Sequence, residues 1–130
     1  MDANQLTTKS QEAYAAAARR ALREGNPAVE PEHLLWAVLQ DDQGIALQVL
    51  DAAGADRDAV REDAEKAVTG LPRASGASVS APAPSGALQR VVATAIDLAS
   101  ARGDTYVSTE LLLLGLATVG GHAADLLRDR

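Results

Sequence analysis

Residues 25–35 read GNPAVEPEHLL, and residues 103–113 read GDTYVSTELLL. Each segment opens with a glycine, which tolerates the left-handed conformation that ends many helices. Each then holds a valine at its fifth position, a glutamate at its eighth and a pair of leucines shortly after it. The two segments lie 78 residues apart. Because the matches fall on a helix end, a connecting turn and the start of the next helix, the sequence specifies the same backbone path twice.

The repeat extends upstream of these segments. The same shift of 78 residues places Thr7 on Ser85, two residues that commonly cap the start of a helix. A single helix-turn-helix unit cannot bury its apolar stripe, whereas two units related by a pseudo-two-fold axis bury their stripes against each other. We therefore predict an all-α fold of two related repeats. A chance overlay of Leu and Ala within a helical protein is the alternative, and the paired glycines and glutamates argue against it.

The helices follow from apolar periodicity and from capping residues. Thr7 or Thr8 caps the first helix, and Asp56, Ser85 and Ser108 cap later ones. The expected helices span residues 8–24, 31–40, 44–53, 56–68, 85–102, 108–119 and 121–128. The apolar stripe of the first helix comprises Ala13, Tyr14, Ala17, Ala18, Ala21 and Leu22.

At 130 residues, the chain fits a single domain. We expect repeat one at residues 1–69, a Gly-, Pro- and Ser-rich linker at residues 70–84, and repeat two at residues 85–130. The second copy stops where its fourth helix is expected to begin. We therefore expect about seven helices. The missing helix implies either that the natural protein continues beyond this sequence or that this is a short variant that lacks it.

Composition excludes several classes of function. Cysteine is absent and the net charge is −6. The first fact excludes disulfides, a cysteine nucleophile and thiolate zinc sites, and the second disfavours a protein that tracks nucleic-acid phosphates. Because neither a signal peptide nor an apolar run of membrane-spanning length is seen, we expect a cytoplasmic protein that does not enter a membrane.

No catalytic motif is present. The sequence has no phosphate-binding loop of the Walker type and no Gly-x-Ser-x-Gly elbow. His33 and His122 are 89 positions apart and belong to no metal-binding motif. We expect His33 to be a turn or surface residue, Trp36 to belong to the core, and the arginines at positions 19, 20 and 23 to form a solvated basic face. The chain is therefore predicted to be neither an enzyme nor a metal protein.

The motifs, taken in order, resemble the amino-terminal domain of Clp-type unfolding ATPases. Segments 6–9 (LTTK), 25–27 (GNP) and 31–35 (PEHLL) resemble the first repeat of the ClpB disaggregase branch. Segment 103–111 is similar to the second-repeat motif of that branch, and GLP at positions 70–72 matches the way its fourth helix ends. Two departures are seen: a leucine replaces histidine at position 111, and the last helix is absent.

This resemblance implies a role in binding. In the family, the domain is joined flexibly to hexameric ATP-hydrolysing rings and captures unfolded or aggregated polypeptide, or an adaptor protein. ATP and magnesium would belong to those rings, so no cofactor is expected in this chain. The isolated domain is expected to be monomeric and to bind neither nucleic acid nor membrane.

The resemblance also implies site residues. Thr7, Asp104 and Glu110 correspond to polar residues tied to chaperone activity in the family. Each also has a simpler structural reading, as a helix cap, a turn former and a complement to the helix dipole, respectively. The family's apolar substrate groove would lie near Leu88, Val91, Val92 and Leu111.

Other functions stay open on the sequence alone. Glu32 and Glu110 occupy equivalent positions, and resemblance to the ClpC branch would make them receptors for arginine-tagged substrates or an adaptor. A structural or dimerisation domain without a client is a second alternative. A stand-alone protein that sequesters a small molecule is a third.

Overall fold

The computed structural model describes residues 5–41, 44–73 and 82–128. Within these ranges, seven helices and two very short strands form. All seven helices occur where the sequence predicts them, and the all-α fold is confirmed. Residues 74–81 of the predicted linker lie outside the described ranges. The elements are α1 (Thr8–Glu24), β1 (Ala28–Val29), α2 (Pro31–Val38), α3 (Ile45–Ala52), α4 (Arg57–Thr69), β2 (Ala83–Pro84), α5 (Gly86–Ala101), α6 (Thr109–Val119) and α7 (His122–Arg128).

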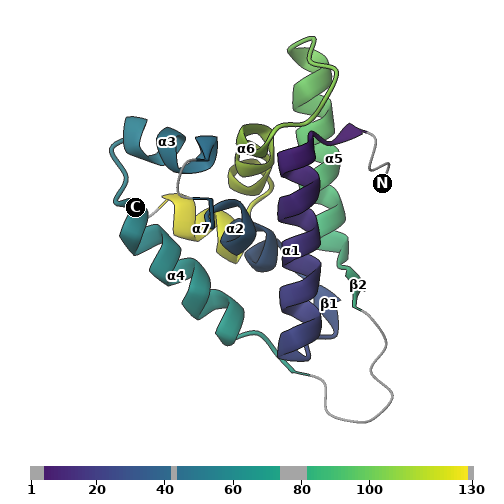
Figure 1. Ribbon diagram of the computed structural model, residues 1–130, viewed down its shortest axis with the longest axis vertical. Coiled ribbons are helices and arrows are strands. Elements are labelled where there is room, and N and C mark those ends of the chain that lie inside the picture. The colour runs from purple at the N-terminus through teal and green to yellow at the C-terminus, as the bar shows by residue number, and fades with distance from the viewer. Residues whose placement is uncertain (1–4, 42–43, 74–81, 129–130) are drawn as a thin grey trace.

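The long helices α1 and α5 lie along one side of the molecule, and α2, α6 and α7 fill its centre (Figure 1). Helix α2 packs on α1 and α4, whereas α6 packs mainly on α5 and α7. Helices α3 and α4 lie on the side away from α5 (Figure 1). The arrangement encloses a core made almost wholly of leucine, valine and alanine side chains.

The segment before each long helix is joined to the turn of the opposite repeat. The amide of Ser85 donates to the carbonyl oxygen of Val29 (2.9 Å), next to the parallel pairing of β1 with β2. In the other half, Leu6 forms a parallel bridge with Val107. A shift of 78 residues converts one junction into the other, which is the signature of a pseudo-two-fold axis. The end of the predicted linker therefore differs from expectation, since residues 83 and 84 pair as a strand.

Local capping explains why both copies follow the same path. Gly25 and Gly103 adopt φ values of 73° and 78°. The next amide in each copy donates back to the helix, from Asn26 to Ala21 (2.9 Å) and from Asp104 to Ala99 (2.8 Å). These are the 6→1 hydrogen bonds of a Schellman motif, so both glycines end helices as predicted.

The starts of the long helices are also equivalent. Thr7, not Thr8, caps α1, because its hydroxyl accepts a hydrogen bond from the amide of Ser10 (3.1 Å). Ser85 accepts from the amide of Leu88 (3.1 Å) in the same way at α5. The apolar stripe of α1 is shorter than predicted, since Leu22 is 51% exposed.

Arg20 corrects the prediction of a solvated basic face. Its side chain is almost fully buried beneath α4, where the guanidinium makes two hydrogen bonds to Glu65 (2.9 and 2.6 Å) and one to Glu24 (3.2 Å). It also lies 4.7 Å from the centre of the Trp36 ring. The carboxylates and the ring offset the cost of removing the charge from water.

His33 is fully buried and is not a surface residue. Its Nδ1 accepts from the amide of Glu30 (2.9 Å), so Nε2 carries the proton and donates to Oδ1 of Asn26 (2.8 Å). The Asn26 amide group in turn donates to the carbonyl oxygen of Pro72 (2.9 Å). This chain of hydrogen bonds fastens the α1–α2 turn to the segment that follows α4.

Candidate functional site

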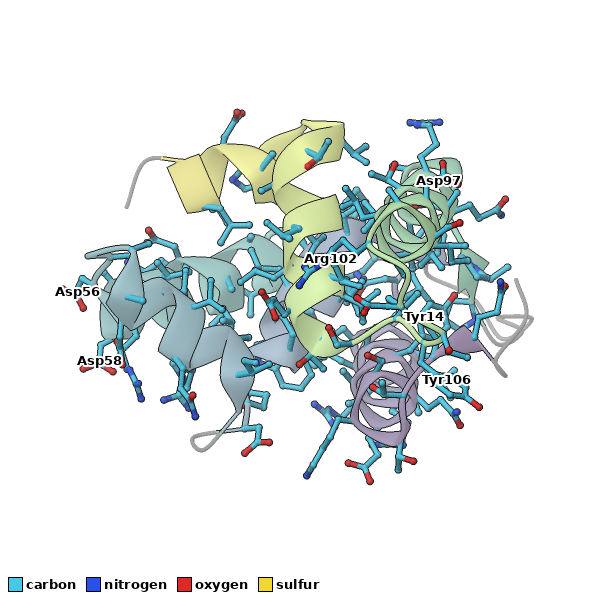
Figure 2. The ribbon with its side chains drawn as sticks, turned by 90° about the horizontal axis from the view of Figure 1, so that it is seen from above. Tyr14, Asp56, Asp58, Asp97, Arg102 and Tyr106 are labelled. Atoms are coloured by element: carbon cyan, nitrogen blue, oxygen red, sulfur yellow. The ribbon has the colours of Figure 1, made fainter. Side chains whose placement is uncertain are left out.

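An uncharged groove lies between α1 and α5, and we call it the α1–α5 groove. It has a volume of about 370 Å³. Its lining residues are Tyr14, Pro84, Gln89, Val92, Ala93 and Ile96. Tyr14 belongs to α1, and its side chain lies between α1 and α5 (Figure 2). Partial burial raises the pKa of its phenol, which therefore stays protonated and neutral. The groove offers apolar surface together with a hydroxyl and an amide.

The apolar residues predicted for a substrate groove lie deeper than expected. Leu88, Val91, Val92 and Leu111 are each at most 2% exposed. They form the face of α5 and α6 that packs into the core, because residues at three- and four-residue spacing on α5 point toward α6. Of the four, Val92 alone lines the groove. The accessible apolar surface is provided instead by its neighbours Ala93 and Ile96.

Thr7 lies at the junction of the two repeats. Its hydroxyl donates to the hydroxyl of Ser10 (3.0 Å), which donates to the carbonyl oxygen of Val107 (2.8 Å). The Thr7 hydroxyl therefore both caps α1 and supports a bridge between repeats. A contact with a partner would have to use the oxygen lone pair that remains or the methyl group.

The structure brings Asp104 and Glu110 to the same cation. The Arg102 guanidinium lies 3.6 Å from the Asp104 carboxylate and 4.0 Å from that of Glu110, and all three side chains are substantially exposed. Arg102 is labelled in Figure 2. Sequence reasoning missed Arg102, although a cation at the C-cap of a helix and two positions before an aspartate is a readable signal.

Glu32 does not join this cluster. Its carboxylate lies 3.7 Å from Nδ1 of His122, and its side chain is only 14% exposed. Glu32 and Glu110 therefore occupy equivalent places in the two repeats but face different partners. The described structure does not unite them in one site.

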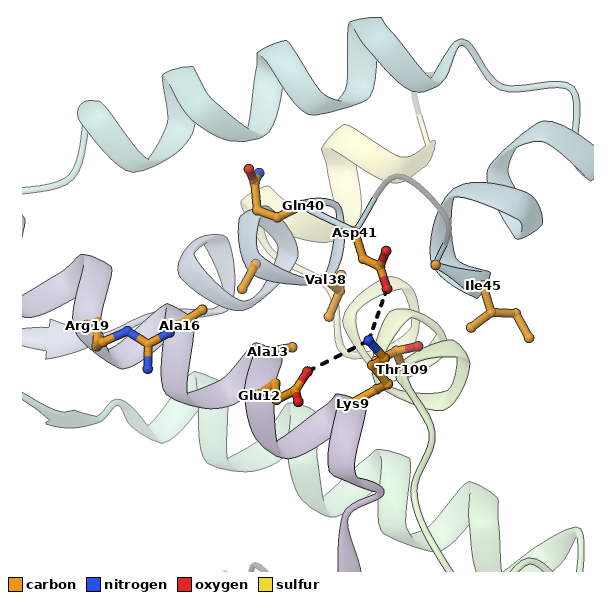
Figure 3. A pocket seen from close by; sticks show the side chains of 12 residues that line it. Lys9, Glu12, Ala13, Ala16, Arg19, Val38, Gln40, Asp41, Ile45 and Thr109 are labelled. Carbon is orange, nitrogen blue, oxygen red and sulfur yellow. Dashed lines mark ion pairs between the residues drawn. The ribbon is translucent and has the colours of Figure 1, made fainter.

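A second, larger pocket is bounded by α1, α2 and the starts of α3 and α6 (Figure 3). We call it the α1–α3 pocket, and its volume is about 550 Å³. This pocket was not predicted from the sequence, because it arises from segments that meet only in the folded chain. The lining residues are Lys9, Glu12, Ala13, Ala16, Arg19, Ala37, Val38, Gln40, Asp41, Gly44, Ile45 and Thr109.

In the described part of the chain, no three His, Asp or Glu residues are grouped as metal ligands. Over the same residues, no helix combines the length and apolarity needed to cross a bilayer.

Comparison with known proteins agrees with this geometry. The family model described as "Clp repeat (R) N-terminal domain" matches residues 5–130. The chain is 46% identical over 124 residues to the chaperone protein ClpB of Corynebacterium diphtheriae, a match that covers 95% of this chain but 15% of that relative. The chain thus spans about one seventh of the length of such relatives.

Two solved structures share the fold. The Hsp104 N-terminal domain from Candida albicans superimposes with a TM-score of 0.85 at 17% sequence identity, covering 96% of this chain and 81% of that one. A ClpV N-domain in complex with a VipB peptide gives a TM-score of 0.74 at 24% identity, covering 95% and 71% of the two chains.

Proposed function

The chain belongs to the family of Clp repeat N-terminal domains, and from this premise we propose that it captures apolar segments of unfolded or aggregated polypeptide for a ClpB-type disaggregase. The domain itself is non-catalytic. Delivery of the client to ATP-hydrolysing rings outside this chain is part of the proposal, as is the assignment of ATP and magnesium to those rings. No cofactor is proposed for the domain.

The α1–α5 groove is the observation that carries this proposal. Its six lining residues are uncharged, and Ala93 and Ile96 leave apolar surface open to solvent. A client segment that buries about 200–300 Å² there would gain roughly 5–7 kcal/mol before costs. The entropy lost on association removes much of that gain. The resulting micromolar to millimolar affinity suits a domain that must release its client.

The ClpV N-domain solved with a VipB peptide supports the proposal by showing that this fold can hold a polypeptide segment. The similarity to proteins named as ClpB chaperones also supports a role in binding polypeptide. The particular groove and its residues are inferred from this chain alone.

The test is a fluorescence anisotropy titration with a labelled, permanently unfolded model protein. Ala93→Asp places a charge at an exposed position of the groove, so it should weaken binding by about tenfold without unfolding the domain. Ala117→Asp makes the same change at an exposed position of α6 outside the groove and serves as the control. Equal binding by both variants and the wild type would refute the groove.

The same titration separates the alternatives. A receptor for arginine tags would bind a phosphoarginine peptide through Glu32 and Glu110, but each carboxylate already faces a cation or a histidine of its own chain. We therefore expect that peptide neither to bind tightly nor to displace the unfolded protein. A structural or dimerisation domain would bind neither probe, and sedimentation would show a dimer that depends on concentration.

A further inference from the structure

The α1–α3 pocket has a floor of small apolar side chains. Ala13, Ala37 and Val38 are nearly buried beneath it. Alanine has a short side chain, so the pocket above this floor stays open. Ile45, at the start of α3, lines the same pocket and is 43% exposed. The pocket therefore has both room and apolar surface for another side chain.

Charge is distributed unevenly along this pocket. At one end, Lys9 forms ion pairs with Glu12 (3.9 Å) and Asp41 (3.8 Å), so two carboxylates and one ammonium group meet there. At the other end lies Arg19, for which the described residues supply no ion-pair partner. Figure 3 shows the two ends on either side of the apolar floor. Since Arg19 follows Lys9 by ten residues on one helix, the ends are about 15 Å apart.

We propose that the α1–α3 pocket binds an amphipathic helix of a partner polypeptide, one that carries a carboxylate near one end of its apolar face and a cation near the other. The carboxylate pairs with Arg19, and the cation lies at the end that holds Glu12 and Asp41. The apolar face covers Val38 and Ile45. This site is separate from the α1–α5 groove and recognises a helix of the partner.

A helix fits better than an extended strand. The pocket is walled by helices, and its lining offers no strand edge to pair with an extended backbone. A helix satisfies its own backbone hydrogen bonds and needs only side-chain contacts. Ten helical residues span about 15 Å, so charges some three turns apart would reach both ends of the pocket at once.

The experiment uses three fluorescein-labelled helical peptides of about 14 residues with the same leucine stripe. One carries Glu at one end and Lys at the other, the second carries Lys at both ends, and the third carries Glu at both ends. The mixed-charge peptide should bind about fivefold more tightly than either of the others at low salt. Arg19→Glu should weaken the mixed-charge peptide and strengthen the peptide with two lysines.

Arg23→Glu is the matched control, because Arg23 is an exposed arginine one turn further along α1 that does not line the pocket. It should leave the order of the three peptides unchanged. Amide chemical shifts in a ¹⁵N-labelled chain should move at Ala13, Val38 and Ile45 and not at Ala93.

Equal binding of the three peptides, equal effects of the two arginine variants, or shifts confined to the α1–α5 groove would each overturn the proposal. So would the absence of binding at millimolar peptide. None of these results bears on the capture of unfolded polypeptide, because that activity is read separately through Ala93→Asp.

Discussion

The amide of Thr7 donates a hydrogen bond of 3.0 Å to the carbonyl oxygen of Val107, a residue of the other repeat. The counterpart bond runs from Ser85 to Val29, so each long helix begins on the turn of the opposite repeat. Both valines are 1% exposed, and these hydrogen bonds are therefore shielded from water. Each long helix is therefore anchored by the other repeat, and both surfaces proposed for binding include residues from the two repeats.

The turn at Gly103 should not tolerate a β-branched residue. Its φ of 78° is left-handed, and nothing lies within 4 Å of an added Cβ, so the penalty would come from the backbone alone. We expect Gly103→Val to lower the free energy of unfolding by about 1–2 kcal/mol. Urea denaturation measures this, with Gly86→Ala as a control at a glycine of negative φ. Equal midpoints for both variants would show that the left-handed turn is not required.

Stability should fall as the pH drops from about 7.5 to 5.5. Burial lowers the pKa of His33, so the folded protein binds a proton less readily than the unfolded chain does. Histidine in the unfolded chain has a pKa of about 6.5, so near and below this pH the unfolded state holds more protons than the folded state. The free energy of unfolding then falls by up to roughly 1.4 kcal/mol for each pH unit. Thermal denaturation across this range measures the slope.

Two variants check the assignment. His33→Leu should remove the slope, although it leaves the Glu30 amide and Oδ1 of Asn26 without the imidazole that each contacts. His122→Gln removes the other histidine of the chain without disturbing the hydrogen bonds of His33, and it should keep the slope. A slope that survived in His33→Leu would assign the titration to another group.

The buried Arg20 should not be replaceable by lysine. Lysine cannot make the paired hydrogen bonds to Glu65 or stack on Trp36 in the same way. We expect Arg20→Lys to reduce stability by about 1–2 kcal/mol. The neighbouring Arg19→Lys should have almost no effect, because Arg19 is exposed. Chemical denaturation of both variants makes the comparison, and matching values would mean that the charge alone matters.

The sequence predicted the helices well because their signals are local. Ser85 and Asp56 lie within three residues of the amides that they cap, and Gly25 ends a helix through bonds to its own last turn. Burial of polar residues is not local. Arg20 is buried because Glu65, 45 positions away, lies over it on α4, and no periodicity in α1 reveals that contact.

One signal for these buried polar residues was available in the repeat itself. Positions 20 and 33 of the first copy correspond to Leu98 and Leu111 in the second, and leucine in one copy marks a position that faces the interior. Leu111 itself lies inside the core, where its side chain is closed to solvent. Resemblance to a family identifies the helices that border a site, but only the packing shows which side chains reach solvent.

This burial changes what a substitution at Leu111 would report. Leu111 is 1% exposed, so Leu111→Glu would place a carboxylate in the core without a partner. We expect a loss of more than about 4 kcal/mol, seen as a collapse of the far-UV dichroism signal at room temperature. Loss of client binding in this variant would then reflect unfolding.

Thr7→Ala is milder but is not neutral either. It removes the cap of α1 and should reduce stability by about 1 kcal/mol, leaving the domain folded at room temperature. Its matched counterpart is Ser85→Ala, which removes the equivalent cap of α5 at similar cost. If Thr7 contacts the client, Thr7→Ala should weaken binding of the unfolded model protein more than Ser85→Ala does at equal stability. Equal weakening by the two variants would assign Thr7 a capping role alone.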